Sequence, residues 1–436
     1  MDINLSTLVT GREVSLKDML DAREHRQEVQ RMLLSEHHLP VISFTLNIVG
    51  PVKVFPLALR TFHEGIRLIE TQCHAWKIPI IATYSTTSHT GHEYFWAVDG
   101  DVRFIKEHLC LLEDSVALGR LFDIDVIQTD GMKISRTDLG FSTRKCLICN
   151  QEAFVCSRAR THSVKELLEQ ECQIMTNYFA KQHARKLSSL SMQALVYEVS
   201  VTPKPGLVDR NNTGAHQDMD IFTFEASAVS LNHYFEQFAL CGIENGHEPF
   251  SRIFSRLRSL GYMYANHIPY SPDTLLKINR KLVAEVLEDF NDVTVENART
   301  NGERLYALYG MKGARGEALS GYHTVLKKAL PVLKHQLDRG LSLNDAGAVT
   351  LLYIMAHSED TNIVNRSSYH SMKKIQALLR ETLNDPEFIN KDPIPYIESL
   401  DREFIKNNIS PGGSADLLAL TFFLYLFENS GLSSIL

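Results

Sequence analysis

One short segment organises the N-terminal half of the chain, and it reads Gly119-Arg120-Leu121-Phe122-Asp123-Ile124-Asp125-Val126. Its leucine, isoleucine and valine favour a packed β-strand, and the glycine predicts a tight turn into that strand. Side chains two residues apart on a strand project from the same face, so Asp123 and Asp125 are expected to lie side by side. Two ionised carboxylates at that separation repel each other unless a cation lies between them.

Magnesium suits this pair because it takes oxygen ligands and leaves room for substrate phosphates. Two aspartates on a strand are also typical of solvated acids at a sheet edge, but the apolar flanks favour the metal interpretation. Arg120 and two upstream residues, Lys53 and Arg60, are candidate ligands for a substrate polyphosphate, since basic groups bind phosphate oxygens. Each of them alone is also typical of a surface cation.

The composition predicts a globular protein of two or three domains. The chain has 436 residues, of which 44% are hydrophobic and 22% charged. The formal net charge of -7 argues against a non-specific nucleic-acid binder. The first residues lack the regions of a signal peptide, and no apolar run is long enough to span a membrane. We therefore expect a cytoplasmic protein whose seven cysteines are thiols or metal ligands.

Helix and strand patterns alternate in the N-terminal half. Besides the strand with the two aspartates, strands are expected at 41–48, 78–84 and 94–98. Ser15, followed by Asp18, is typical of a helix N-cap. This order predicts an α+β domain in residues 1–180, with helices packed on a small mixed sheet.

A cluster of possible metal ligands follows in the same domain. Cys146 and Cys149 form a C-x-x-C pair, and Cys156 and His162 come shortly after it. Three thiolates and an imidazole suit a tetrahedral Zn²⁺ site. The spacing after the first pair is unusually short for a zinc finger, and buried thiols near a turn are the alternative.

The C-terminal half changes character. Strand patterns vanish and a helical periodicity dominates, which predicts an all-α domain in residues 181–436. No linker precedes it, so the boundary is expected within or between helices near Lys181. The polar residues gather in four connecting loops, at 202–220, 302–317, 360–366 and 410–416.

These four loops predict a convergent pocket for a magnesium–nucleotide complex. Each loop mixes glycine with Asp, Asn, Arg or Glu, although each alone is also typical of a helix cap or turn. In the last loop, Gly412 and Gly413 open a helix whose first backbone N–H groups suit a phosphate. A G-x-x-x-x-G-K-[ST] loop is absent, which excludes a P-loop enzyme.

Both halves resemble known enzyme families. The first 175 residues resemble holo-citrate lyase synthase, the phosphoribosyl-dephospho-CoA transferase that acts on citrate lyase, in segments 50–53, 119–126, 144–149 and 155–162. The second half resembles triphosphoribosyl-dephospho-CoA synthase, in segments 198–220, 302–317, 360–362 and 411–416. The chain thus resembles a fusion of the enzymes that make and attach one prosthetic group.

The resemblance implies two successive reactions, with ATP and 3'-dephospho-CoA as substrates. In the first, the 2'-hydroxyl of dephospho-CoA displaces adenine from C1' of the ATP ribose in the C-terminal domain. In the second, a nucleotidyltransferase-like N-terminal domain passes the phosphoribosyl-dephospho-CoA group to a serine of the citrate lyase acyl carrier protein and releases pyrophosphate. Such transfer depends on positioning and on neutralising oxygen charge, which Asp123 and Asp125 would provide by holding Mg²⁺.

The same resemblance implies residues for the first reaction. An acid-rich pocket would stabilise positive charge at C1', and a base would take the hydroxyl proton; Glu317, Asp218 and Asp220 are the candidates. The candidate substrate and phosphate ligands are Lys204, Asn212, His216, Arg304, Arg315, Asp360, Asn362, Gly412 and Gly413.

One departure from the synthase family concerns a helix-rich segment. Its Asn-Thr-His-Lys-Gly motif is absent, and the chain skips the segment around residues 261–269. A deleted helix leaves apolar faces uncovered and removes substrate ligands, which predicts weak or absent adenine release. Three alternatives therefore stand beside the fusion: a helical half that only binds the precursor, a malonate decarboxylase counterpart, and a nucleotidyltransferase with another target.

Overall fold

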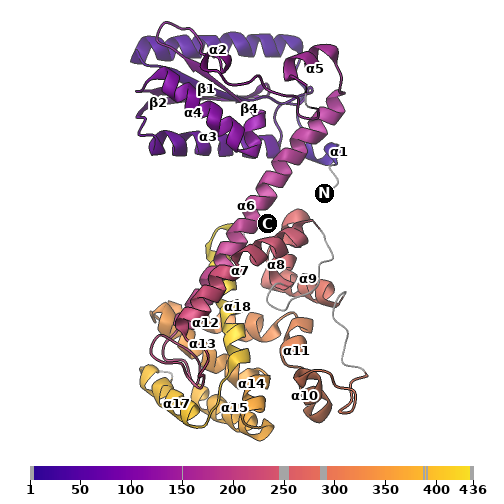
Figure 1. The fold of residues 1–436 in the computed structure, drawn as a ribbon, viewed down its shortest axis with the longest axis vertical. Coiled ribbons are helices and arrows are strands. Elements are labelled where there is room, and N and C mark those ends of the chain that lie inside the picture. Colours follow the sequence, from indigo (N-terminus) through magenta and orange to yellow (C-terminus); the bar gives the residue numbers. More distant parts are fainter. Residues whose placement is uncertain are drawn as a thin grey trace. The chain divides into compact units, whose positions relative to one another are not determined.

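The computed structural model describes residues 4–149, 151–244, 255–284, 292–385, 388 and 391–432. The chain forms two compact units, Met1–Phe179 and Ala180–Leu436 (Figure 1). The expected boundary lies one residue from this division. The helix α6, Val164–Ser200, begins in unit 1 and ends in unit 2, so the division falls inside a helix.

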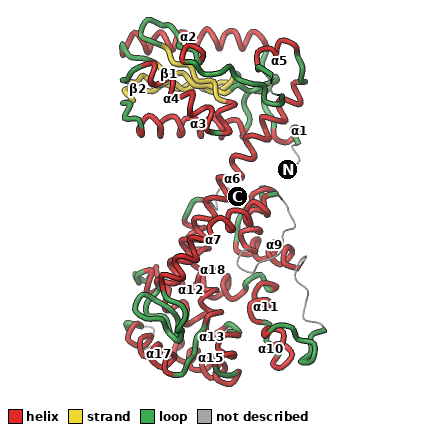
Figure 2. The backbone as a smooth tube through the Cα atoms, in the orientation of Figure 1, coloured by secondary structure: helices red, strands yellow, loops and turns green. Residues whose placement is uncertain are grey.

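Unit 1 contains one four-stranded sheet. Its strands, drawn in yellow in Figure 2, are β1 (Val41–Leu46), β2 (Ile80–Ser88), β3 (Gly91–Val98) and β4 (Phe122–Ile127). Within the sheet they lie in the order β2-β3-β1-β4. The expectation of a mixed sheet is wrong, because all three pairings of this sheet are antiparallel. The alternation of helices and strands did not reveal this, since the chain reverses direction across the intervening helices.

The helices of unit 1 are α1 (Leu5–Leu8), α2 (Leu16–His37), α3 (Pro56–Ala75), α4 (Val102–Ser115), α5 (Ala153–Ala159) and the first part of α6. Two short 3-10 turns, Ala117–Leu121 and Thr137–Leu139, complete it. The predicted cap of α2 is confirmed: Ser15 Oγ accepts from Asp18 N–H, and the Asp18 carboxylate accepts from Ser15 N–H.

The two faces of the sheet differ. One face carries Phe44, Trp96 and Phe122, which are fully buried in the larger core of unit 1. The helices α3 and α4 lie on one side of the sheet, and α2 lies on the other (Figure 1). There Val29 and Leu33 pack against a smaller apolar cluster on the strands. Alternation along each strand therefore separates a deep apolar core from a face that α2 covers.

The helices of unit 2 surround a single apolar core. After α6 they are α7 (Ile221–Ile243), α8 (Ser255–Ala265), α9 (Pro272–Ala284), α10 (Asn301–Tyr309), α11 (Gly313–Leu319), the π-helical turn Val325–Ala329, α12 (Leu330–Asp338), α13 (Leu343–His357), α14 (Thr361–Arg366), α15 (Tyr369–Asn384), α17 (Ile394–Lys406) and α18 (Gly412–Asn429). The described residues of unit 2 form no strand, as the all-α prediction requires.

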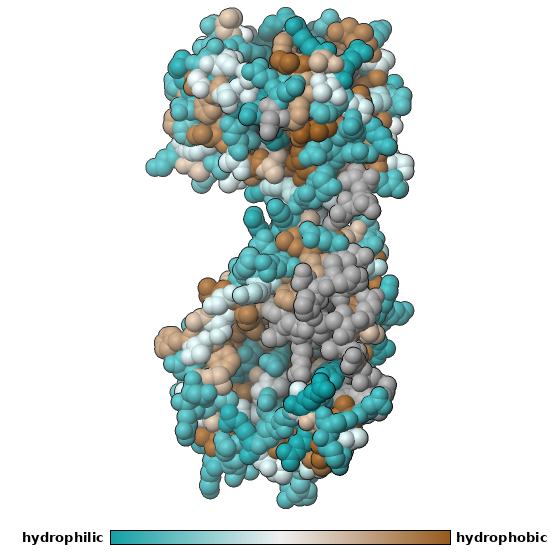
Figure 3. Space-filling view, turned by 45° about the vertical axis from the view of Figure 1, so that its right-hand side comes forward, coloured by the Kyte–Doolittle hydropathy of each residue, from teal (hydrophilic) through white to brown (hydrophobic). Residues whose placement is uncertain are grey.

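Large apolar side chains are exposed on several elements, α7 among them. Hydrophilic side chains dominate the face drawn in Figure 3, with apolar ones scattered among them. On α7, however, Phe222, Val229 and Tyr234 are 74%, 65% and 53% exposed. Leu16 of α2 and Phe154 of α5 are 78% and 63% exposed, so such exposure is not peculiar to α7. Among the described residues, no helix is long and apolar enough to cross a membrane.

Replacing Gly65 of α3 should destabilise unit 1. A Cβ atom at Gly65 would overlap the ring of Phe44, which is fully buried on β1. Because the ring has no free space to enter, Gly65→Ala should lower the free energy of unfolding by about 1–3 kcal/mol, measured by chemical denaturation with a unit 1 probe. Gly302→Ala, in α10 of unit 2, is a control that adds a Cβ with no atom closer than 4.0 Å, and it should leave the unit 1 transition unchanged. Equal stability of the two variants would contradict the close packing of α3 on β1.

Candidate active sites of the two units

The two aspartates of β4 lie on one face of the sheet. Asp123 is exposed and Asp125 is half-buried, whereas the alternating Phe122, Ile124 and Val126 are buried. The period of two therefore places both carboxylates on the face that α2 partly covers. Across the sheet, Asp123 pairs with Thr45 and Asp125 with Ser43 of β1.

A row of polar residues continues from Asp123 across the sheet. Thr45 pairs with Glu93 of β3, and Glu93 pairs with Thr86 of β2. Arg26 of α2 binds the Glu93 carboxylate through two nitrogens, at 2.7 and 2.6 Å from Oε1. This two-point contact fixes the position of α2 over the polar end of the sheet.

A cavity of about 150 Å³ opens at this end of the sheet. The charged residues that line it are Asp123, Arg23, Arg26, Lys53 and Glu93. Within the described residues, the Asp123 carboxylate has no hydrogen-bond or ion-pair partner, unlike Glu93. An unpaired carboxylate beside three basic side chains suits an anionic substrate that brings a divalent cation.

A buried acid and Lys53 hold the loop after β1. Lys53 Nζ donates to the Ile48 carbonyl at 2.5 Å, and burial lowers its pKa although Glu171 opposes this. Glu171 of α6 is fully buried and accepts from Val49 N–H at 3.1 Å. Burial raises its pKa to about 7, against the effect of the Val49 N–H group and Lys53. The role of Glu171 could not be predicted from the sequence, because nothing in a helical pattern marks an acid that binds a loop 122 residues away.

The other candidates of unit 1 have other neighbours. Lys133 Nζ donates to Asp125 at 2.5 Å. The Arg60 guanidinium lies 4.0 Å from the centre of the Phe179 ring. Arg120 donates to the Lys145 carbonyl. In the described part of the chain, neither Arg60 nor Arg120 lines the cavity at Asp123.

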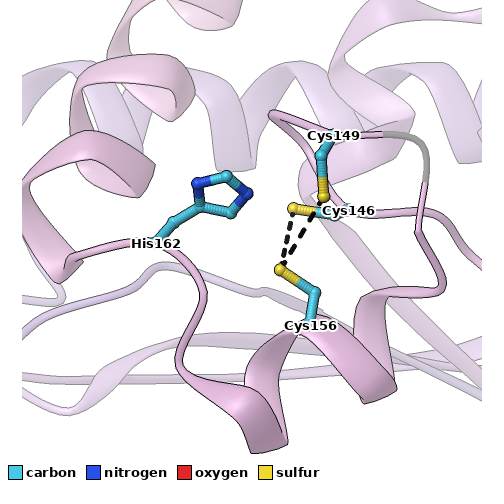
Figure 4. Close-up of side chains that lie close together, drawn as sticks. All are labelled: Cys146, Cys149, Cys156 and His162. Carbon is cyan, nitrogen blue, oxygen red and sulfur yellow. Dashed lines mark hydrogen bonds between the residues drawn. The ribbon is translucent and has the colours of Figure 1, made fainter.

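The predicted cysteine and histidine ligands come together. Cys146, Cys149, Cys156 and His162 each offer one ligand atom, and these atoms lie within 4.8 Å of one another (Figure 4). Burial raises the pKa of the Cys146 thiol, but N–H donors from Cys149 and Ile148 outweigh it and lower the pKa to about 6.

In unit 2, Asp360 joins two helices. Its Oδ1 accepts from the N–H groups of Asn362 and Ile363 at the start of α14. Its Oδ2 accepts from the N–H and hydroxyl groups of Ser414 at the start of α18, at 2.7 and 2.8 Å. Burial raises the pKa of Asp360, and these four donors lower it. The Asp360 carboxylate thus caps the α18 N-terminus that was expected to take a phosphate.

The two glycines at the start of α18 allow this contact. A Cβ atom at Gly413 would lie 3.2 Å from Asp360 Oδ1, and one at Gly412 would lie 2.7 Å from Asn362 Nδ2. The structure therefore brings these four predicted residues together, with glycine needed for the close approach of the α13–α14 connection.

The loop at 202–220 packs against the same region. His216 Nε2 lies 2.9 Å from Ser410 Oγ, and its Nδ1 lies 3.2 Å from Arg366 Nη2. Burial lowers the pKa of His216, and the positive charge of Arg366 lowers it further. Asn212 Nδ2 donates to Asp401 at 3.3 Å.

Lys204, in the same loop, is buried. Its Nζ donates to Glu198 Oε1 at 2.6 Å, and both side chains are nearly inaccessible. Removing one member of such a pair leaves a buried charge alone. Lys204 therefore fixes the path of this loop.

A cavity of about 360 Å³ lies beside these loops. Its walls are mainly apolar, and Glu317, Glu359 and Asp416 supply its acids. Glu317 accepts from Thr324 Oγ1 at 2.5 Å, and Glu359 from Lys312 N–H at 2.8 Å. An apolar cavity with a few acids can bind a nucleotide base and stabilise a cation. Glu359 was not among the residues predicted from the sequence, although it directly precedes the candidate Asp360.

Four other candidates are not among the described residues that line this cavity. Asp220 caps α7 by accepting from Thr223 N–H at 2.8 Å, and Asp218 is exposed. Arg315 lies 3.7 Å from the Glu303 carboxylate, and Arg304 is exposed on α10.

Comparison with known families accounts for both units. Residues 14–178 match the model of the apo-citrate lyase phosphoribosyl-dephospho-CoA transferase family. Residues 184–268 and 265–434 match the model of the ATP:dephospho-CoA triphosphoribosyl transferase family.

Curated relatives cover nearly the whole chain. A protein of Haemophilus influenzae named "Protein CitXG" is 30% identical over 463 residues, 96% of this chain and 98% of the relative. A protein of the same name from Leuconostoc mesenteroides is 30% identical over 458 residues, which cover 95% of this chain and 97% of the relative. The 2-(5''-triphosphoribosyl)-3'-dephosphocoenzyme-A synthase of Haemophilus ducreyi is 32% identical over 325 residues, which cover 63% of this chain and 98% of the relative.

The interruption in the second match has a structural position. The two matched stretches overlap at residues 265–268, from the end of α8 into the connection to α9. The alignment to the Haemophilus influenzae protein, at 463 positions, is also longer than the 436 residues of this chain. The chain belongs to both families: its first unit is an apo-citrate lyase phosphoribosyl-dephospho-CoA transferase domain, and its second is an ATP:dephospho-CoA triphosphoribosyl transferase domain.

Proposed function

We propose that the chain makes and attaches the prosthetic group of citrate lyase. Unit 2 joins ATP to 3'-dephospho-CoA and releases adenine, giving 2'-(5''-triphosphoribosyl)-3'-dephospho-CoA. Unit 1 then transfers the phosphoribosyl-dephospho-CoA group to a serine of the citrate lyase acyl carrier protein and releases pyrophosphate. The match of each unit to its own family supports this pairing. Seven free cysteines suit a reducing compartment such as the cytoplasm.

The transfer reaction is proposed to take place at the Asp123 cavity. Asp123 and Asp125 offer oxygen ligands that fit Mg²⁺, which would neutralise charge on the phosphate oxygens. Arg23, Arg26 and Lys53 line the same cavity and bind the donor's phosphates. We propose that unit 1 is nucleotidyltransferase-like because it places two carboxylates on one strand and surrounds them with basic side chains. The single observation that carries this site is the unpaired Asp123 carboxylate among these cations.

Adenine release is proposed to take place at the larger cavity of unit 2. Positive charge develops at C1' of the ribose as adenine leaves, and Glu317, Glu359 and Asp416 supply negative charge around that cavity. Its apolar walls suit the adenine base. Of the three acids predicted from the sequence, Glu317 lines this cavity. We therefore assign Glu317 the role of the carboxylate that stabilises the positive charge at C1'.

A second candidate function rests on the interrupted family match. In this candidate, a family segment is missing where the match divides at residues 265–268, and unit 2 binds the triphosphoribosyl precursor without forming it. Both candidates keep the same transferase reaction in unit 1.

Asp123→Asn should abolish transfer. The substitution keeps the shape of the side chain but removes the charge that holds the cation, so the rate should fall by about 100-fold or more. Intact-mass measurement of the apo carrier, incubated with Mg²⁺ and preformed triphosphoribosyl donor, checks this. Asp130→Asn, in an exposed turn, is the matched control and should transfer normally. Normal transfer by Asp123→Asn would refute the site, and modification of a malonate decarboxylase carrier instead would change the assigned partner.

Adenine release from ATP and dephospho-CoA tests unit 2. The full chain should release adenine, more slowly than uninterrupted relatives do, and Glu317→Gln should slow it by a further ~100-fold. Chromatographic measurement of adenine checks this, with the exposed Glu381→Gln as control. If the full chain releases no adenine but still transfers a supplied donor, the binding-only candidate replaces the synthase proposal. Unchanged release by Glu317→Gln would remove Glu317 from the mechanism.

A further inference from the structure

A compact hairpin and helix in unit 1 bring the cysteine–histidine cluster together. Lys145 and Glu152 form an antiparallel bridge, and Cys146 N–H donates to the Gln151 carbonyl at 2.8 Å. This hairpin carries Cys146 and Cys149 and leads directly into α5, which carries Cys156.

His162 reaches the cluster from beyond α5. The helix ends at Ala159, and the left-handed backbone of the next residue, Arg160 (φ of 49°), turns the chain. Thr161 N–H then donates to the Cys156 carbonyl at 3.2 Å. The imidazole of His162 consequently lies beside the three thiols (Figure 4).

The distances between the sulfur atoms fit a tetrahedral metal site. Cys156 Sγ lies 3.5 Å from Cys146 Sγ and 4.0 Å from Cys149 Sγ. Four ligands around Zn²⁺, with Zn–S bonds of about 2.3 Å, place sulfur atoms about 3.8 Å apart. The observed separations lie on both sides of that value. The ligand atoms thus surround a space of the size that a zinc ion needs.

The environment of His162 also points to a missing ligand. Its Nε2 atom is buried, and in the described part of the chain no hydrogen-bond partner contacts it. A buried nitrogen without a partner costs free energy, whereas a metal ion would satisfy it. Ile148 N–H donates to Cys146 Sγ at 3.4 Å, as backbone groups do towards metal-bound thiolates.

We propose that Cys146, Cys149, Cys156 and His162 bind one structural zinc ion. Three thiolates and one imidazole are the ligands that zinc prefers, and four protein ligands leave no open position for catalysis. A disulfide between two of the thiols would leave the third thiol and His162 without partners. Zinc uses all four groups.

The proposed zinc site supports the strand that carries the aspartates. Arg144, at the start of the hairpin, donates to the Phe122 carbonyl at 2.6 Å and pairs with buried Glu113 at 2.6 Å. Phe122 directly precedes Asp123. By fixing the hairpin, the zinc ion holds Arg144 against β4 and so stabilises the position of Asp123.

Metal analysis of the full, untagged chain tests the proposal. Protein produced with zinc should contain about one zinc per chain, and chelation should remove it. Cobalt added to the stripped protein should give the visible absorption of a tetrahedral, thiolate-bound ion. Cys149→Ser and His162→Ala should each bind zinc at least about tenfold more weakly. Cys110→Ala, a buried cysteine of α4 outside the cluster, should retain the metal.

The results that would overturn the proposal are metal-binding measurements, which do not require an active enzyme. Protein without zinc that also fails to take up cobalt after stripping would refute the site, as would iron in place of zinc. Full zinc retention by both cluster variants would show an adventitious ion. Removing the metal from the unaltered chain and adding cobalt does not depend on whether a variant folds. This measurement therefore decides the proposal even when a cluster variant misfolds.

Discussion

The pairing of β1 with β4 is the constraint on which unit 1 depends. Phe44 faces Ile124 across this pairing, and Thr45 faces Asp123. A shift of the register by one residue would turn both aspartates towards the core that holds Phe44 and Trp96. Burying even one ionised carboxylate there costs several kcal/mol, so the apolar residues of β4 keep the carboxylates on the open face. The chemistry of Asp123 is thus a consequence of the packing of its neighbours.

Unit 2 uses a buried carboxylate in a different way. Asp360 receives four hydrogen bonds from the starts of α14 and α18, and its carboxyl oxygens occupy those donors in place of a ligand anion. The two helices are therefore held together at the wall of the larger cavity, which Thr361 and Gly413 line. Asp360 stabilises the cavity, and the acids that line it are Glu317, Glu359 and Asp416.

Local patterns predicted those features that depend on neighbours in the sequence. The period of two placed Asp123 and Asp125 on one face, and the spacing of Ser15 and Asp18 predicted a helix cap. Contacts between distant residues could not be predicted in this way. Arg26 binds Glu93 from 67 residues away, and single-residue patterns carry no information on such pairs. Strand patterns also lack direction, so they did not reveal the antiparallel sheet.

Polar residues in loops were the hardest to assign. Lys204 has the composition of a phosphate ligand, but its charge is buried against Glu198. Gly412 and Gly413 resemble a phosphate-binding turn, yet they make room for Asn362 and Asp360. In both cases the same residue types serve packing and ligand binding, and only the positions of distant partners distinguish the two roles.

Binding of Mn²⁺, as a spectroscopic substitute for Mg²⁺, tests most directly whether the two β4 carboxylates hold one divalent ion. In the structure, the Lys133 ammonium group is paired with the Asp125 carboxylate, so a divalent ion must displace Lys133 in order to bind there. Electron paramagnetic resonance titration should show one site that Asp125→Asn weakens at least about tenfold, and that Lys133→Ala strengthens. Equal Mn²⁺ affinity in all three proteins would contradict the account, because the carboxylate pair would then have no part in holding the ion.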